Sequence, residues 1–108
     1  GGVFRPRGFG FSGSEAARAV VKDISSLLAG IDASAIGSAG GGADIGPSVE
    51  AGKMASMSLD VDSSLYFTIH HTSADTIDKI APADLAKCVA AIAVMSYVVA
   101  DMPQRLPR

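Results

Sequence analysis

The sequence is short of several residue types that would point to a particular class of protein. It has a single cysteine, Cys88, and no asparagine. One cysteine excludes an internal disulfide, and the absence of asparagine excludes an N-glycosylation sequon. Nine basic and eleven acidic residues are spread along the chain without a block of one sign. The charge pattern therefore does not favour nucleic acid or an anionic membrane as a partner.

Targeting signals are also missing from the first residues. The chain opens Gly-Gly-Val-Phe-Arg-Pro-Arg, without an initiating methionine and without the charged, apolar and cleavage regions of a signal peptide. We expect either a processed N-terminus or a chain that begins inside a longer one. With 108 residues, 48% of them hydrophobic and 19% charged, the chain is the size of one small domain that can form a core.

The first half of the chain is expected to contain a helix, a strand and a short second helix. Residues 1–13 are interpreted as an irregular segment because they hold five glycines and a proline. Ser14 is expected to cap a helix that ends at Gly30, and residues 33–38 form an apolar strand. After Gly40, Gly41 and Gly42, the short helix 44–51 is expected to have Asp44 as its N-cap, Pro47 in its first turn and Gly52 as its stop. The apolar positions of the first helix recur at helical spacing: Ala16, Ala19, Val20, Ile24, Leu27 and Leu28.

The second half is expected to hold two extended segments and a long apolar helix. Residues 54–61 predict a strand, 62–64 a turn and 66–69 a further extended segment. Pro82 opens the last helix, in which Lys87 is the only charge among the sixteen residues 85–100. A membrane span needs about 20 apolar residues, so a buried core helix is expected here. Residues 103–108 form a polar, proline-rich tail that we expect to fray.

This order of elements predicts an α/β fold with few strands. The last helix is apolar almost all round, and such a helix needs cover on every side. One other helix and a small sheet cannot supply that cover. We therefore interpret the chain as a fragment of a three-layer α/β/α domain from which partner structure is missing.

The run His70-His-Thr-Ser-Ala-Asp75-Thr is the most chemically distinctive stretch of the sequence. Its two histidines are the only ones in the chain, and a neutral imidazole is a good zinc ligand. Asp75 is placed to orient a histidine ring as a hydrogen-bond acceptor. A plainer interpretation is two surface or half-buried histidines followed by a helix cap. The plainer interpretation stays open because a catalytic zinc site needs about three protein ligands. The sequence shows no evident further ligands beside the two histidines.

Other motifs fit known chemistry poorly. The glycine run from Gly40 to Gly46 has neither the dinucleotide-binding spacing nor the Lys-Ser/Thr of a P-loop, and Asp44 would repel an anion there. No serine stands in a Gly-x-Ser-x-Gly elbow. Cys88 lies in the apolar helix and is interpreted as core packing.

The order of these motifs resembles the C-terminal part of the catalytic domain of co-catalytic di-zinc exopeptidases. The matching features are Gly-Gly-x-Phe-x-Pro-Arg-Gly-Phe at the start, Gly-Gly-Gly-Ala-Asp-Ile-Gly-Pro, and Tyr-Phe-x-x-His-His-Thr-x-Ala-Asp-Thr. The likeness is greatest to the carboxypeptidase Q family and related bacterial aminopeptidases. It covers nearly the whole chain, and the His-His-Thr-x-Ala-Asp-Thr run is its most specific part.

The resemblance implies a zinc metallopeptidase that hydrolyses the peptide bond next to a free chain terminus. By position, His71 is the implied zinc ligand, while Asp75, His70, Asp44 and Tyr66 line the site or support it. The remaining ligands of the two zinc ions and the glutamate base lie upstream in that family. We therefore expect no catalytic residue in this fragment and no activity from it alone. Its partners would be a peptide substrate and the upstream part of its own catalytic domain, in a secreted or periplasmic location.

A second hypothesis comes from a different class of protein. The chain could act as a non-catalytic α/β module whose uncovered apolar faces are satisfied by self-association. Neither hypothesis involves nucleic acid or a membrane.

Overall fold

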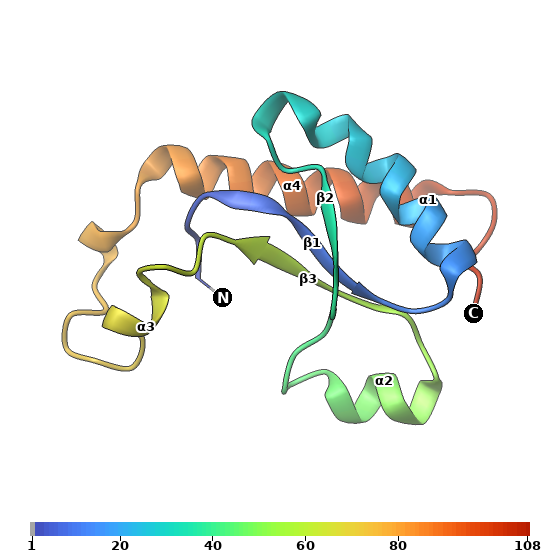
Figure 1. Ribbon diagram of the computed structural model, residues 1–108, viewed down its shortest axis with the longest axis horizontal. Helices are drawn as coiled ribbons and strands as arrows, with labels where there is room; N and C mark the ends of the chain where they lie inside the picture. Colours follow the sequence, from blue (N-terminus) through green and yellow to red (C-terminus); the bar gives the residue numbers. More distant parts are fainter. Residues whose placement is uncertain (1) are drawn as a thin grey trace.

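A computed structural model describes residues 2–108 and shows a small mixed sheet with helices packed on one face (Figure 1). The strands are β1 (Pro6–Ser12), β2 (Ala35–Ser38) and β3 (Ser56–Val61), in the spatial order β2-β1-β3. β1 runs parallel to β2 and antiparallel to β3. Parallel neighbours need a crossover connection. The α-helix α1 (Glu15–Ser25) and the 3-10 helix η1 (Ser26–Ile31) supply it.

The remaining helices follow the sheet strands in the chain. α2 (Gly46–Gly52) connects β2 to β3, and α3 (Tyr66–Ile69) follows β3. A 3-10 turn, η2 (Ile77–Lys79), then leads into the long helix α4 (Pro82–Asp101). The fold is therefore α/β, as the sequence predicts. α1 and α4 pack on the same face of the sheet, whereas α2 buries none of its residues. The third layer of an α/β/α domain stays a prediction about a larger protein.

The central strand β1 is where the sequence interpretation is wrong. Residues 6–12 form a strand that pairs with both neighbours and not an irregular segment, although its pairing with β3 is irregular between Pro6 and Gly8. Phe9 and Phe11 are 4% and 1% exposed and pack against both helices. On the other face, Gly8 and Gly10 let the backbone of residues 35–39 pass very close. The glycines that suggested an irregular segment are therefore what the close approach of residues 35–39 requires.

The first helix starts as predicted but turns a slightly different side to the core. The Ser14 hydroxyl oxygen accepts a hydrogen bond from the Ala17 backbone N–H at 3.1 Å, so the predicted cap is confirmed. The helical segment continues past Gly30 and ends at Asp32, which adopts the left-handed conformation. Leu27 is 66% exposed, in contrast to the expectation. Ile24 and Leu28 are buried as predicted, whereas Ala17 and Val21 are buried in place of Ala16, Ala19 and Val20.

Arg18 joins this helix to the ends of the parallel strands. Its guanidinium donates hydrogen bonds to the backbone oxygens of Gly37, at 3.1 Å, and Phe11, at 3.0 Å. The same group lies 5.3 Å from the centre of the Phe11 ring, within the range of a cation–π contact. One side chain thus fixes α1, β1 and β2 relative to one another.

Two predictions for the short elements are wrong. α2 has Ile45 at its N-cap position, without a side-chain cap, so Asp44 does not cap it. Pro47 does lie in the first turn. Residues 66–69 form one turn of helix instead of an extended segment. The Thr68 hydroxyl donates to the Leu65 carbonyl oxygen at 2.6 Å, which favours a helical turn over the β preference of Tyr66 and Phe67.

The last helix has the predicted position but is only partly covered. Cys88, Ala91 and Met95 form its buried line against the core. Its outer side is exposed, as expected for an apolar helix with too little structure around it. By length and composition alone it could also cross a bilayer. The tail beyond Pro103 has no regular structure, but it docks on α1, since the Ser14 hydroxyl donates to the Pro107 carbonyl oxygen at 3.2 Å.

An ion cluster holds the start of β1 against the turn that leads to α3. The Asp62 carboxylate lies 3.4 Å from the Arg5 guanidinium and 3.2 Å from that of Arg7. It also accepts a hydrogen bond from the Ser64 backbone N–H at 3.0 Å. That backbone bond, followed by the Ser64 hydroxyl and Arg7, lowers the pKa of Asp62 from 3.8 to about 2.

Replacing Gly8 tests the close crossing of β2 over β1. Gly8 has φ +148°, and an added Cβ would stand 1.9 Å from the Ala35 carbonyl oxygen. We predict that Gly8→Ala lowers the free energy of unfolding by more than about 2 kcal/mol, measured by urea denaturation. Gly30→Ala is the matched control, because its Cβ would meet nothing within 4 Å. It should change stability by less than about 1 kcal/mol. Equal effects would contradict the described crossing.

The Asp62 cluster predicts a defined pH dependence of stability. The pKa of Asp62 is lower in the folded state, so its contribution is present above about pH 4 and is lost as the pH falls toward 2. We predict that Asp62→Asn lowers the thermal unfolding midpoint above pH 4 and that the deficit shrinks toward pH 2. Asp60→Asn, at an exposed position of β3, serves as the control. A deficit of Asp62→Asn that is constant over this range would contradict the assignment.

Candidate functional site

The two histidines lie at the end of the single turn α3. His70 follows the last residue of the helix, and its backbone N–H donates to the Tyr66 carbonyl oxygen at 2.8 Å. His71 adopts φ +58°, a left-handed conformation that is uncommon for residues other than glycine. Such backbone outliers occur preferentially at functional sites. The chain reverses at this point, which leaves His71 exposed.

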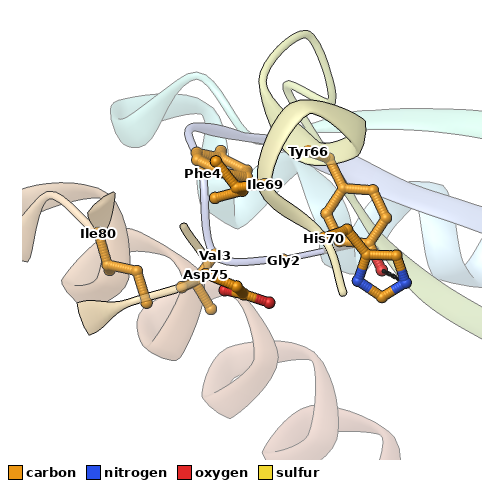
Figure 2. A pocket seen from close by; sticks show the side chains of 8 residues that line it. All are labelled: Gly2, Val3, Phe4, Tyr66, Ile69, His70, Asp75 and Ile80. Carbon is orange, nitrogen blue, oxygen red and sulfur yellow. Dashed lines mark hydrogen bonds between the residues drawn. The ribbon is translucent and has the colours of Figure 1, made fainter. Parts of the chain in front are cut away.

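Three aromatic rings stack in series at this site. The Tyr66 and His70 ring centres are 4.4 Å apart with an angle of 22° between the planes. The His70 and His71 ring centres are 3.7 Å apart at 28°. The Tyr66 hydroxyl and His70 Nε2 are 3.3 Å apart, so the hydroxyl donates or accepts depending on the imidazole tautomer (Figure 2). The His70 ring is thus in contact with Tyr66, whereas His71 is exposed to solvent.

A small apolar hollow of about 100 Å³ adjoins the stacked rings. Figure 2 shows Tyr66 and His70 at one end of it and Ile80 at the other. Sequence analysis identified three of its residues, Tyr66, His70 and Asp75. Most of the others come from the first residues of the chain and from the segment before α4, which only the folded structure brings together. They are Gly2, Val3, Phe4, Ile69 and Ile80.

The structure places the two predicted carboxylates differently. Asp75 lines the hollow, but within residues 2–108 the hydrogen bond to a histidine ring comes from Tyr66 and not from Asp75. Asp44 lies in the exposed turn before α2. Figure 1 shows α2 well apart from α3, so this chain by itself does not bring Asp44 to the histidines. Cys88 is buried, its Sγ lies 3.1 Å from the Phe4 carbonyl oxygen, and burial followed by Asp84 raises its thiol pKa, which fits packing.

The donor set for a metal ion is incomplete in the described part of the chain. No group of three or more His, Cys, Asp and Glu side chains converges there. A catalytic zinc site takes about three protein ligands. Residues 2–108 therefore do not fit a complete zinc site, and the histidines can supply only part of one.

Comparison with known proteins finds one kind of relative. No protein-family model and no solved structure matches the chain. Carboxypeptidase Q of Pongo abelii is 42% identical over 107 residues, and the human protein is 41% identical over the same length. Carboxypeptidase Q of Mus musculus is 39% identical over 107 residues. These alignments cover 99% of this chain but only 22–23% of the relatives. Over nearly its whole length, the chain is thus similar to a segment of carboxypeptidase Q, and it spans less than a quarter of the length of these relatives.

Proposed function

We propose that this chain is the C-terminal part of the catalytic domain of a zinc-dependent exopeptidase. The observation that carries the proposal is the sequence match to carboxypeptidase Q over 99% of the chain. The parent protein would hydrolyse peptide bonds next to a free chain terminus, in a secreted or periplasmic location. Amino-terminal and carboxy-terminal attack both remain compatible with the residues present.

We assign the zinc-binding role to His71 and a supporting role to His70. His71 is exposed and lies on an unusual left-handed backbone, which suits a ring presented to a ligand. His70 Nε2 has Tyr66 as its partner instead, and the His70 ring stacks between Tyr66 and His71. His70 and Tyr66 would therefore hold the His71 ring in position. Asp75 and Asp44 are proposed to line the completed site.

The other metal ligands and the general base would come from the upstream part of the same catalytic domain. This follows from the incomplete donor set in residues 2–108 and from the short share of the relatives that the chain covers. Zinc, when bound, supplies Lewis-acid chemistry at the scissile carbonyl. This chain would contribute one zinc ligand, His71, and the side chains that line the site around it.

A non-catalytic, self-associating α/β module remains the second candidate. The observation that favours it is the exposure of four large apolar residues on one helix, Leu85, Val89, Ile92 and Tyr97. Single exposed apolar side chains are ordinary, but a cluster on one surface marks an interaction site. The two proposals are compatible, because they concern the parent protein and the isolated chain respectively.

Paired histidine variants test the metal assignment. In the full-length parent, we predict that His71→Ala loses zinc and at least about 100-fold of the activity, because one ligand is removed. His70→Ala is the matched control at the neighbouring position and should retain most of the zinc. Metal content by mass spectrometry and peptide hydrolysis are the two measurements. Equal zinc content in the wild type and His71→Ala would refute the assignment.

The isolated 108-residue chain provides a separate test. We predict no hydrolysis of aminoacyl or dipeptide substrates, even with added zinc, because residues 2–108 bring together no group of three side chains that could hold the metal. Turnover that a chelator abolishes, in a preparation free of other peptidases, would show that the chain contains a complete site.

A further inference from the structure

The segment between β2 and β3 leaves the sheet and returns to it at nearly the same point. Residues 41–54 of this segment include α2, and none of them is buried. Gly40 precedes them and Ser56 follows them, and the Ser56 hydroxyl donates a hydrogen bond to the Gly40 carbonyl oxygen at 3.1 Å. A surface loop of about 6–16 residues whose ends lie close together is an Ω-loop, a type of loop that is frequently functional. Residues 41–54 have this form.

Two serines hold the base of this loop on the sheet. Ser12, the last residue of β1, is paired with Ser56, the first residue of β3. The Ser12 hydroxyl donates to the Gly40 carbonyl oxygen at 3.1 Å and accepts from the Gly40 backbone N–H at 3.0 Å. A Cβ at position 40 would stand 2.3 Å from the Ser56 carbonyl oxygen and 2.5 Å from that of Gly10. Only glycine therefore fits at this close approach, and we call Ser12, Gly40 and Ser56 the base clamp.

Beyond the base clamp, the loop is tied to little besides itself. In the chain from residue 2 to residue 108, the hydrogen bonds of residues 42–54 stay within that segment. One of them joins the Met54 backbone N–H to the Val49 carbonyl oxygen at 3.1 Å. Over the same described residues, α2 does not pack extensively on another helix or strand. Figure 1 shows α2 standing away from α1 and α4. Segments with few buried contacts open at low free-energy cost.

Both ends of the loop have backbone conformations in which the chain turns sharply. Gly41 has φ +124°, a region that favours glycine. A side chain at Gly42 would meet nothing within 4 Å. At the other end, Lys53 follows Gly52 and is left-handed, with φ +47°. Hinges are a few loop or element-terminal residues that absorb changes in φ and ψ. These two pairs of residues are suitably placed for that role.

We propose that residues 41–54 form a hinged flap, which opens and closes while the base clamp and the sheet stay in place. The flap carries Asp44, which the structure leaves apart from the histidines (Figure 1). Motion of the flap would therefore change the position of this carboxylate relative to the sheet. The role of Asp44 in a completed site belongs to the proposed function. The flap does not rest on that function, because its tests use the 108-residue chain alone.

Limited proteolysis with trypsin tests whether the flap opens independently of the sheet. Lys53 is exposed and is the only basic residue of the flap. We expect cleavage after Lys53 at a rate that Gly8→Ala, which destabilises the whole fold, changes by less than about twofold. Cleavage after Lys22, an exposed position of α1, is the matched control. It should become about 30-fold faster in Gly8→Ala, because cleavage there requires global unfolding.

Urea below the unfolding midpoint provides the same comparison without a substitution. Local opening exposes little additional surface, so the rate at Lys53 should be insensitive to urea, whereas the rate at Lys22 should rise with it. Mass spectrometry of the fragments measures both rates. An equal acceleration at Lys53 and Lys22 would show that the loop opens only when the whole chain unfolds, and it would overturn the proposal.

Hydrogen exchange measured by NMR tests the base clamp. If the mobile part begins after Gly40, the Gly40 amide should exchange at least about 10-fold more slowly than the Gly42 amide, relative to their intrinsic rates. Ser12→Ala removes the acceptor of the Gly40 N–H and should abolish this difference. Ser48→Ala, at an exposed position of α2, is the matched control and should preserve it. Equal exchange at Gly40 and Gly42 in the unaltered chain, or a difference that survives Ser12→Ala, would refute the clamped hinge.

Discussion

The packing of Phe9 and Phe11 against α1 and α4 is the interaction on which the rest of this structure depends. Each fully buried phenylalanine stabilises the fold by roughly 1.5–3 kcal/mol, and these two stand on the central strand, which pairs with β2 and with β3. The opposite face of the same strand is glycine, which allows the backbone of residues 35–39 to pass close to it. One short strand therefore anchors both helices on one side and sets the crossing of β2 on the other. β3, and with it the segment that carries the histidines, is aligned by pairing with the same strand.

The candidate site lies in the least buried part of the molecule. Between Asp62 and Ala81, none of the residues is fully buried, and the regular structure is limited to one α-helical turn and one 3-10 turn. Local contacts hold this segment: the Asp62 cluster at its start and the stacked rings of Tyr66, His70 and His71. Segments with few buried contacts open at low free-energy cost. A site of this kind gains rigidity when further structure packs on it, which agrees with our proposal that other parts of a peptidase domain complete it.

Much of the fold could be predicted because local signals and the final structure agree. The Ser14 cap, the strands near residues 35–38 and 56–61, and the start of α4 at Pro82 all follow from residue type and spacing. The strand β1 could not be predicted, because its glycines are explained only by the close approach of β2 in the folded structure. α3 was missed because hydrogen bonds of Thr68 and the preceding turn outweigh the β preference of two aromatic residues. At the site, the histidine run was evident in sequence, whereas Val3, Phe4 and Ile80 reach it only through tertiary structure.

Our central proposal is that this chain is one part of a larger peptidase and supplies only some of its site. The outer side of α4 and the incomplete donor set are then two consequences of the same missing structure. The intact mass of the natural protein, isolated from its source with an antibody against this chain, tests the claim most directly. The account predicts a mass about four to five times the 10.9 kDa of the chain, in line with the 22% of its relatives that it covers. A natural product of 10.9 kDa would contradict it.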